Sequence, residues 1–125
     1  MSFHPNVFRA DTRPMHAVRP DLPGTVIPGR DITLVRWEID PQRAATGLHA
    51  HPDHEQFTVV VSGRIETNVD GEVVVLGPGD VCRITPGSSH GATRALGSEV
   101  AILVDVFSPP RQDYLAAAFA HRTER

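Results

Sequence analysis

The stretch LHAHPDHEQFTVVVSG, residues 48–63, places three histidines, an acid and an amide within eight positions, ahead of an apolar run and a glycine. Side chains two apart in a strand share one face, so His49 and His51 point the same way and can bind one ion together. A Pro-Asp pair then interrupts the strand, and the alternation after it puts Glu55 and Gln56 on opposite faces. Periodicity alone does not decide which of these two faces points inward.

Short apolar segments continue along the chain and predict strands about every 8 to 12 residues, separated by glycine-containing turns. These segments are ITLVRWEID, QFTVVVSG, RIETNVDGE, EVVVLGPGD, DVCRITPG and EVAILVDVF. Such a pattern indicates an antiparallel sandwich or barrel. Only the end of the chain is helical in character: Ser108 suits a helix cap, Pro109 suits the first helical position, and QDYLAAAFAHR continues with good helix formers.

The first 30 residues differ in texture from the rest of the 125-residue chain. They hold five of the eleven prolines and only scattered apolar positions, which favours an extended arm with little core of its own. We therefore expect one domain, in which residues 1–30 form the arm and residues 31–125 form an all-β barrel with a short C-terminal helix. The arm is suited to cross onto the sheet edge of a second copy, so we expect a homodimer.

Composition excludes several classes of function. A net charge of −3 with 40% apolar residues leaves no basic surplus for nucleic acid or for a membrane surface. The apolar runs have strand length and the first 25 residues carry charges, so we expect no membrane span, no signal peptide and a cytoplasmic location. All twelve basic residues are arginine, which excludes chemistry that needs a lysine amine. Cys82, the single cysteine, is interpreted as a small core residue.

The opening stretch resembles the first signature of the cupin superfamily, in which HxH is followed by an acid or amide ligand, six residues and a glycine. Six residues separate Gln56 from Gly63, whereas seven separate Glu55 from it. GPGDVCRITPGSSHG, residues 77–91, is similar to the second signature and places the last ligand at His90. The resemblance implies a double-stranded β-helix, the jelly-roll cupin barrel, from about residue 31 to residue 107.

The same resemblance implies that His49, His51, Gln56 and His90 converge on one divalent metal ion, with Zn, Ni, Mn and Fe all suited to these ligands. All four ligands are neutral, so the ion keeps its full charge and is a stronger Lewis acid than one bound by a glutamate. The alternative is a set of surface histidines in a polar loop. With Gln56 as the ligand, Glu55 either hydrogen-bonds a ligand from outside the ligand set or forms a salt bridge. His54 either supports a ligand or the pocket, or is exposed to solvent.

A third stretch, AILVDVFSPPRQDYL at residues 101–115, places an aspartate inside an apolar strand, which is costly unless the carboxylate is paired or functional. It looks like the C-terminal strand of the small cupins of pectin and alginate breakdown, which linearise 4,5-unsaturated uronates. That likeness implies Asp105 as acid/base, Phe107 as pocket wall and Arg111 as carboxylate clamp. The alternative is a structural ion pair between Asp105 and Arg111. Trp37 alternates with apolar neighbours and is interpreted as a core residue.

These features favour a metal-dependent, non-redox enzyme that opens or tautomerises a small carboxylated sugar-like or keto/enol substrate. Three other functions use the same fold. An Fe(II) cupin dioxygenase would use the open metal positions for oxygen, and a polyketide cyclase or dehydratase would use the same pocket. A cupin that binds a small ligand or a metal without catalysis belongs to a different class. No helix-turn-helix pattern suggests a regulator of transcription.

Overall fold

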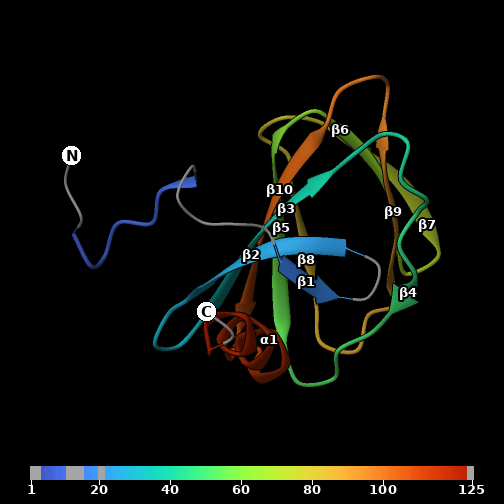
Figure 1. Ribbon diagram of the computed structural model, residues 1–125. Helices are drawn as coiled ribbons and strands as arrows, with labels where there is room; N and C mark the ends of the chain where they lie inside the picture. Colours follow the sequence, from blue (N-terminus) through green and yellow to red (C-terminus); the bar gives the residue numbers. More distant parts are fainter. Residues whose placement is uncertain (1–3, 11–15, 20–21, 124–125) are drawn as a thin grey trace.

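The computed structural model describes residues 4–10, 16–19 and 22–123. In this part of the chain, strands form two antiparallel sheets that enclose one core, with a single helix at one end (Figure 1). The six-stranded sheet has the order β1 (His16–Arg19), β2 (Leu22–Pro28), β3 (Thr33–Ile39), β10 (Ala101–Ser108), β5 (Glu55–Ser62) and β8 (Val81–Ile84). The four-stranded sheet has the order β4 (Leu48–His49), β9 (His90–Leu96), β6 (Arg64–Val69) and β7 (Glu72–Leu76). The expected all-β jelly roll is confirmed.

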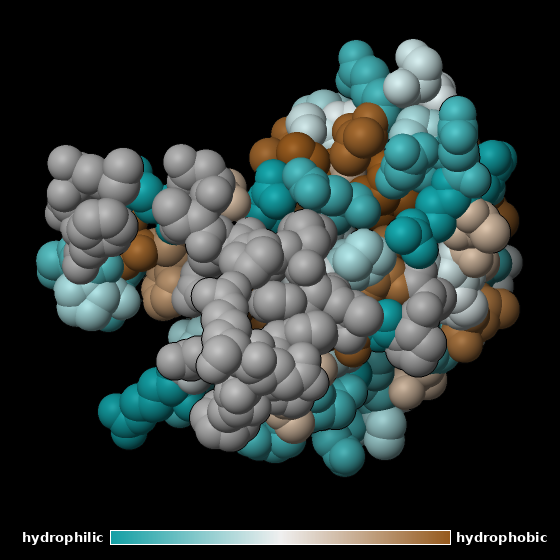
Figure 2. Space-filling model, in the orientation of Figure 1, coloured by the Kyte–Doolittle hydropathy of each residue, from teal (hydrophilic) through white to brown (hydrophobic). Residues whose placement is uncertain are grey.

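Strict alternation along the central strands explains why they form this barrel. Every second residue of β3 and of β10 is buried, and their antiparallel register pairs Val35 with Asp105 and Trp37 with Leu103. Branched and aromatic side chains of both sheets fill the interior, with Val35, Trp37, Ile39, Val60, Ile65 and Phe107 among the most deeply buried. Figure 2 shows that hydrophobic residues also reach the surface in patches.

The N-terminal segment contributes more to the barrel than its proline content suggests. Residues 4–10 are exposed and extend away from the barrel (Figure 1). Residues 16–19 and 22–28, however, form β1 and β2, and β2 pairs with β3 over five residues. Val18, Leu22 and Val26 belong to the hydrophobic core cluster. The apolar positions that look scattered in the sequence are therefore spaced for one face of an added hairpin.

The helix begins later than the sequence predicts, and this expectation was wrong. Ser108 is the last residue of β10, and α1 runs over Gln112–Thr123. A residue that precedes proline disfavours helical backbone, and both Ser108 and Pro109 precede a proline. The first helical turn instead follows Arg111, whose carbonyl accepts a hydrogen bond from the Leu115 N–H at 3.0 Å. No helix in the described part of the chain is long and apolar enough to cross a membrane.

Gly63, which closes the opening stretch, is required by its backbone and by its neighbours. Its φ is +75°, and an added Cβ would lie 2.8 Å from the Ala101 Cα and 2.9 Å from the Val100 carbonyl oxygen. Gly71 has a similar φ of +85°, but nothing lies within 4 Å of the Cβ position. The two glycines therefore separate the cost of the left-handed backbone from the cost of contact with the start of β10.

We expect Gly71→Ala to lower the free energy of unfolding by about 1 to 2 kcal/mol, because only the left-handed conformation opposes it. Gly63→Ala should lose a further 1 to 3 kcal/mol, approximately, because the added methyl group overpacks against backbone that cannot move aside. Urea unfolding of both variants measures the difference. Equal losses would show that the contact with Ala101 is not what requires a glycine at position 63.

Candidate metal centre and pocket

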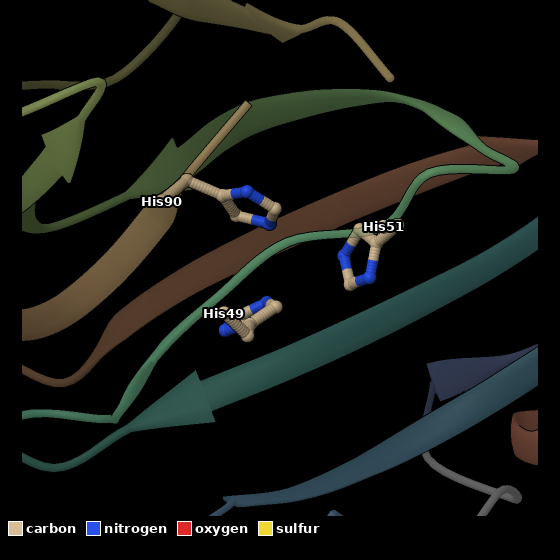
Figure 3. Close-up of side chains that lie close together, drawn as sticks. All are labelled: His49, His51 and His90. Carbon is tan, nitrogen blue, oxygen red and sulfur yellow. The ribbon is translucent and has the colours of Figure 1, made fainter. Parts of the chain in front are cut away.

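Three histidines lie together where the four-stranded sheet meets the mouth of the barrel. β4 pairs with β9 so that His49 is directly opposite His90, and His51 follows two residues after His49. One ring nitrogen from each histidine lies within 4.8 Å of the others, so the three histidines could hold a metal ion. Figure 3 shows the three rings around a common space. The structure thus brings together the three histidines that the two signatures imply.

Hydrogen bonds fix which nitrogen two of these histidines present. Nδ1 of His90 lies 2.9 Å from the Ser88 carbonyl oxygen, and Nδ1 of His49 lies 3.2 Å from the Gly47 carbonyl oxygen. A carbonyl oxygen only accepts, so Nδ1 carries the proton in both rings and Nε2 keeps its lone pair. Nε2 of His90 is buried and has no hydrogen-bond partner. Both rings are therefore set in the tautomer that a metal ligand needs.

Burial keeps these imidazoles neutral. Removal from solvent, together with the nearby His90 and Arg19, lowers the pKa of His49 from 6.5 to about 4. Burial and the Arg111 guanidinium lower the pKa of His51 to about 3, and burial also lowers the pKa of His90. At neutral pH all three rings are therefore neutral, and no proton has to leave before a cation can bind.

Gln56 lies inside the barrel and Glu55 lies outside it, which decides the question that periodicity left open. The Gln56 side chain is 4% exposed, whereas Glu55 is exposed at the start of β5. The amide nitrogen of Gln56 donates to the Thr58 hydroxyl at 3.0 Å, and Oε1 of Gln56 is a buried atom without a hydrogen-bond partner. Gln56 also lies close enough to His51 to affect the pKa of that ring.

The two buried side-chain atoms without partners in the described part of the chain are Oε1 of Gln56 and Nε2 of His90. An unsatisfied buried acceptor costs about 1 to 3 kcal/mol, so a native structure rarely leaves two in one cavity. Both atoms are good ligands for a divalent cation, and neither can be satisfied by the other because both are acceptors. The residues present therefore fit a metal ion held by three imidazoles and an amide oxygen.

Asp105 is buried in the same cavity, with both carboxylate oxygens engaged. Nε1 of Trp37 donates to Oδ2 at 2.8 Å, and the Thr58 hydroxyl donates to Oδ1 at 2.6 Å. Burial raises the pKa of Asp105 above its usual value, although the hydrogen bonds from Thr58 and Trp37 oppose that shift. A carboxyl group with a raised pKa in a cavity is suited to take up and release a proton.

Arg111 pairs with Asp113 and not with Asp105, so the alternative of a structural Asp105–Arg111 ion pair is wrong. Its Nε and Nη2 donate to the two carboxylate oxygens of Asp113 at 2.9 and 2.7 Å. The guanidinium lies over the rings of Tyr114 and Phe107, with Cζ at 3.9 and 4.9 Å from their centroids. Only Nη1 is directed toward the histidines, at 3.5 Å from Nε2 of His51.

The remaining candidates take supporting positions. Nε2 of His54 donates to the Pro110 carbonyl oxygen at 3.3 Å, so His54 joins the loop after β4 to the segment that carries Arg111. Phe107 is 2% exposed, and its ring centroid lies 6.0 Å from that of His51, so it forms part of the wall. The Cys82 side chain is half-buried and lines the interior cavity.

Two neighbouring spaces adjoin the histidines. The interior cavity, about 50 Å³, holds only a few waters and is lined by Trp37, Gln56, Thr58, His90, Asp105 and Phe107, among others. The outer recess, about 290 Å³, approaches the size of a small-molecule pocket and is lined by Val18, Arg19, His49, His51, Arg111, Asp113 and Tyr114. Arg19, His49 and Tyr114 line both spaces. A small anionic ligand in the recess would therefore meet two arginines beside the histidines.

Sequence reasoning did not identify Thr58, Arg19 or Tyr114 as members of the site. Thr58 has the same strand parity as Gln56, which is a usable signal once the inward face is known. Arg19 lies in the segment expected to be an arm, and Tyr114 lies in the helix, so only the packing of β1 and α1 brings them to the recess. Trp37 is a core residue as expected, but its indole N–H also serves Asp105.

Comparison with known proteins places this geometry in a family. The pectin degradation protein KdgF of Dickeya dadantii (strain 3937) is 34% identical over 67 residues, which are 54% of this chain and 59% of that protein. The chain thus spans little more than half the length of this curated relative.

Solved structures agree over more of the chain. KdgF from a Halomonas species superposes with a TM-score of 0.77 and 28% identity, covering 86% of this chain and 96% of that one. An RmlC-like cupin from Shewanella frigidimarina NCIMB 400 gives a TM-score of 0.74 and 27% identity, covering 87% and 95%. The family model described as Cupin domain matches residues 35–107, from within β3 to the penultimate residue of β10. The chain therefore belongs to the cupin family.

Proposed function

We propose that this protein is a metal-dependent, non-redox isomerase that opens the ring of a small 4,5-unsaturated uronate. The observation that carries the proposal is the pair of unpartnered buried acceptors, Oε1 of Gln56 and Nε2 of His90, in a cavity that also holds the Asp105 carboxyl group. The relative from Dickeya dadantii is named pectin degradation protein KdgF, and the similar structure from Halomonas is also named KdgF. These two names support this substrate class.

His49, His51, Gln56 and His90 would hold the cation. When bound to four neutral ligands, a divalent ion supplies Lewis acidity that favours loss of a proton from a coordinated oxygen. The chain's own contribution is to keep the imidazoles deprotonated and the amide oxygen turned inward. His49 and His51 also line the outer recess, together with Arg19 and Arg111, so a substrate bound there would lie beside two of the four residues that would hold the cation.

Arg111 would orient the substrate carboxylate through the N–H groups of its two terminal nitrogens that Asp113 and His51 leave free. Tyr114 lines the same recess and would restrict the sugar ring from one side, whereas Phe107 supports the guanidinium from beneath.

Asp105 would transfer the proton. Opening a 4,5-unsaturated uronate breaks the bond between C1 and the ring oxygen and removes the O1 proton, which leaves an aldehyde at C1 and an enolate at C5. A proton added at C4 then converts the enolate to a ketone. Substrate and product are isomers, so no oxidant is consumed. A buried carboxyl group with a raised pKa can accept the first proton and donate the second.

Metal binding is the first test. Chelator-treated protein titrated with Zn²⁺, Ni²⁺ or Mn²⁺ should bind one ion, and a free concentration of 100 times Kd should stabilise the fold by about 2.7 kcal/mol. His90→Ala removes a ligand and should weaken binding by more than about 100-fold, since even partners that only orient a ligand contribute 10- to 100-fold. His54→Ala is the matched control and should bind as the wild type does. Equal weakening in both variants would contradict the ligand assignment.

Activity is the second test. With metal at saturation, Asp105→Asn should lower kcat for an unsaturated uronate by about 10²- to 10⁴-fold, the usual contribution of a general acid or base. Asp53→Asn changes an exposed carboxylate in the neighbouring loop and should leave kcat unchanged. Turnover by Asp105→Asn or His51→Ala at the wild-type rate would sink the proposal. Oxygen uptake coupled to turnover would favour a dioxygenase, and binding without chemical change would favour a non-catalytic cupin.

We also propose that the protein is cytoplasmic and forms a homodimer. The apolar outer face of the six-stranded sheet supports the dimer. The register pairs Val81 of β8 with Val59 of β5, and Val59 with Val104 of β10. Val61 and Val81 are about half exposed, at 51% and 55%. An extended apolar sheet face of this kind is suited to packing against the same face of a second copy.

Light scattering of the purified chain should give twice the 13.6 kDa mass of the monomer. Val81→Glu places a charge on the outer face and should shift the mass to that of the monomer, because a buried unpaired carboxylate opposes association. Val73→Glu, at the exposed edge strand β7 of the other sheet, serves as the control and should leave the dimer intact. A monomeric wild type would refute the proposed dimer.

A further inference from the structure

We propose that Thr58 is a positioning residue that sets the Gln56 amide with its oxygen toward the histidines, through a chain of hydrogen bonds that has only one consistent direction while Asp105 is ionised. The chain runs from the Gln56 amide to Thr58 and on to Asp105, where Trp37 closes it. This inference rests on the proposed metal site and extends it, because it assigns Asp105 a second task besides proton transfer.

The direction of the chain is decided at Trp37. An indole N–H can donate but cannot accept, and it donates to Oδ2 of Asp105 at 2.8 Å. The other carboxylate oxygen, Oδ1, lies 2.6 Å from the Thr58 hydroxyl, which gives its single proton to this bond. Once that proton is committed to Asp105, the Thr58 oxygen can only accept from its remaining neighbour.

That neighbour is the Gln56 side chain, at 3.0 Å, and an acceptor at Thr58 requires the amide NH2 on this side. The amide oxygen then points the other way, where it is buried without a hydrogen-bond partner. If the amide were turned over, its NH2 would take that place, and an N–H donor cannot ligate a cation. Thr58 therefore holds the Gln56 amide so that its oxygen is available as a ligand atom, and Asp105, which also interacts with the Gln56 side chain, supports the same orientation.

Burial makes this orientation strict. Gln56, Thr58, Asp105 and Trp37 are all less than a tenth exposed, so water cannot easily replace a missing partner. Because a buried donor or acceptor without a hydrogen bond is costly, reversal of one hydrogen bond forces reversal of the next. The fixed donor at Trp37 thus sets, through Asp105 and Thr58, which atom of the Gln56 amide is available as a ligand.

An asparagine at position 105 would reverse the chain. Trp37 requires an acceptor at the Oδ2 position, so the new amide oxygen takes that place and the new NH2 faces Thr58. Thr58 would then receive donors from both sides, unless Gln56 turns over and accepts the Thr58 proton through its oxygen. Asp105→Asn should therefore weaken metal binding as well as proton transfer, although residue 105 is not a ligand.

The experiment measures the affinity of chelator-treated protein for Zn²⁺ by competition with a chromogenic chelator, and the visible absorption spectrum of the Co²⁺ form. Thr58→Val should lower Zn²⁺ affinity by about 10- to 100-fold and change the Co²⁺ spectrum, since the amide loses its orienting partner. Thr58→Ser keeps the hydroxyl and should bind as the wild type does. Thr25→Val, a buried threonine of β2 outside the pocket lining, should also bind normally.

Asp105→Asn carries the test independently, in case Thr58→Val does not fold, and should show the same loss of affinity and the same spectral change. Wild-type affinity in both Thr58→Val and Asp105→Asn would overturn the inference. So would equal weakening by Thr58→Ser and Thr58→Val, because the methyl packing and not the hydroxyl would then be responsible. No substrate is present in these measurements, so failure of the proposed uronate reaction appears separately, as a wild type that binds metal but leaves the uronate unchanged.

Discussion

The short pairing of β4 with β9 is the constraint on which the site depends. It spans only two residue pairs, Leu48 with Gly91 and His49 with His90, yet it brings two ligands from distant parts of the chain to the same place. The pairing needs a glycine at position 91, where φ is +125° and an added Cβ would collide with the Gly47 carbonyl oxygen. That same carbonyl accepts the Nδ1 proton of His49, so one close backbone approach both joins the strands and sets a tautomer.

The interior supplies the second half of the site by a different physical means. β5 and β10 are neighbours in the six-stranded sheet, and their inward faces carry Gln56, Thr58 and Asp105 in place of apolar residues. Polar groups at such positions are tolerated only when each is satisfied. Among these three residues only Oε1 of Gln56 lacks a hydrogen-bond partner, and the other such buried atom in the described residues is Nε2 of His90 on β9.

The recess in front of the histidines has an electrostatic character that follows from its arginines. Asp113 holds the Arg111 fork in a two-point ion pair, which fixes the guanidinium against two aromatic rings and leaves Nη1 directed toward His51. Arg19 adds a second positive charge on the side of His49, and its charge contributes to the lowered pKa of that histidine. A pocket with this distribution favours small anions and disfavours protonated imidazoles, two effects that both support metal-assisted chemistry on a carboxylate.

The sequence by itself determined the strand pattern, the tight turns and the two histidine signatures, because these features depend on local periodicity and on spacing along the chain. The resemblance of these stretches to the two cupin signatures also implied His49, His51, Gln56 and His90 as one set. The sequence did not determine the start of α1, where tandem prolines delay the helix, nor the partner of Arg111. Only the tertiary structure decided that Gln56 faces inward, that Trp37 and Thr58 orient Asp105, and that β1 and α1 bring Arg19 and Tyr114 to the recess. Those facts depend on strand register and on contacts between segments far apart in the chain, which local sequence patterns do not encode.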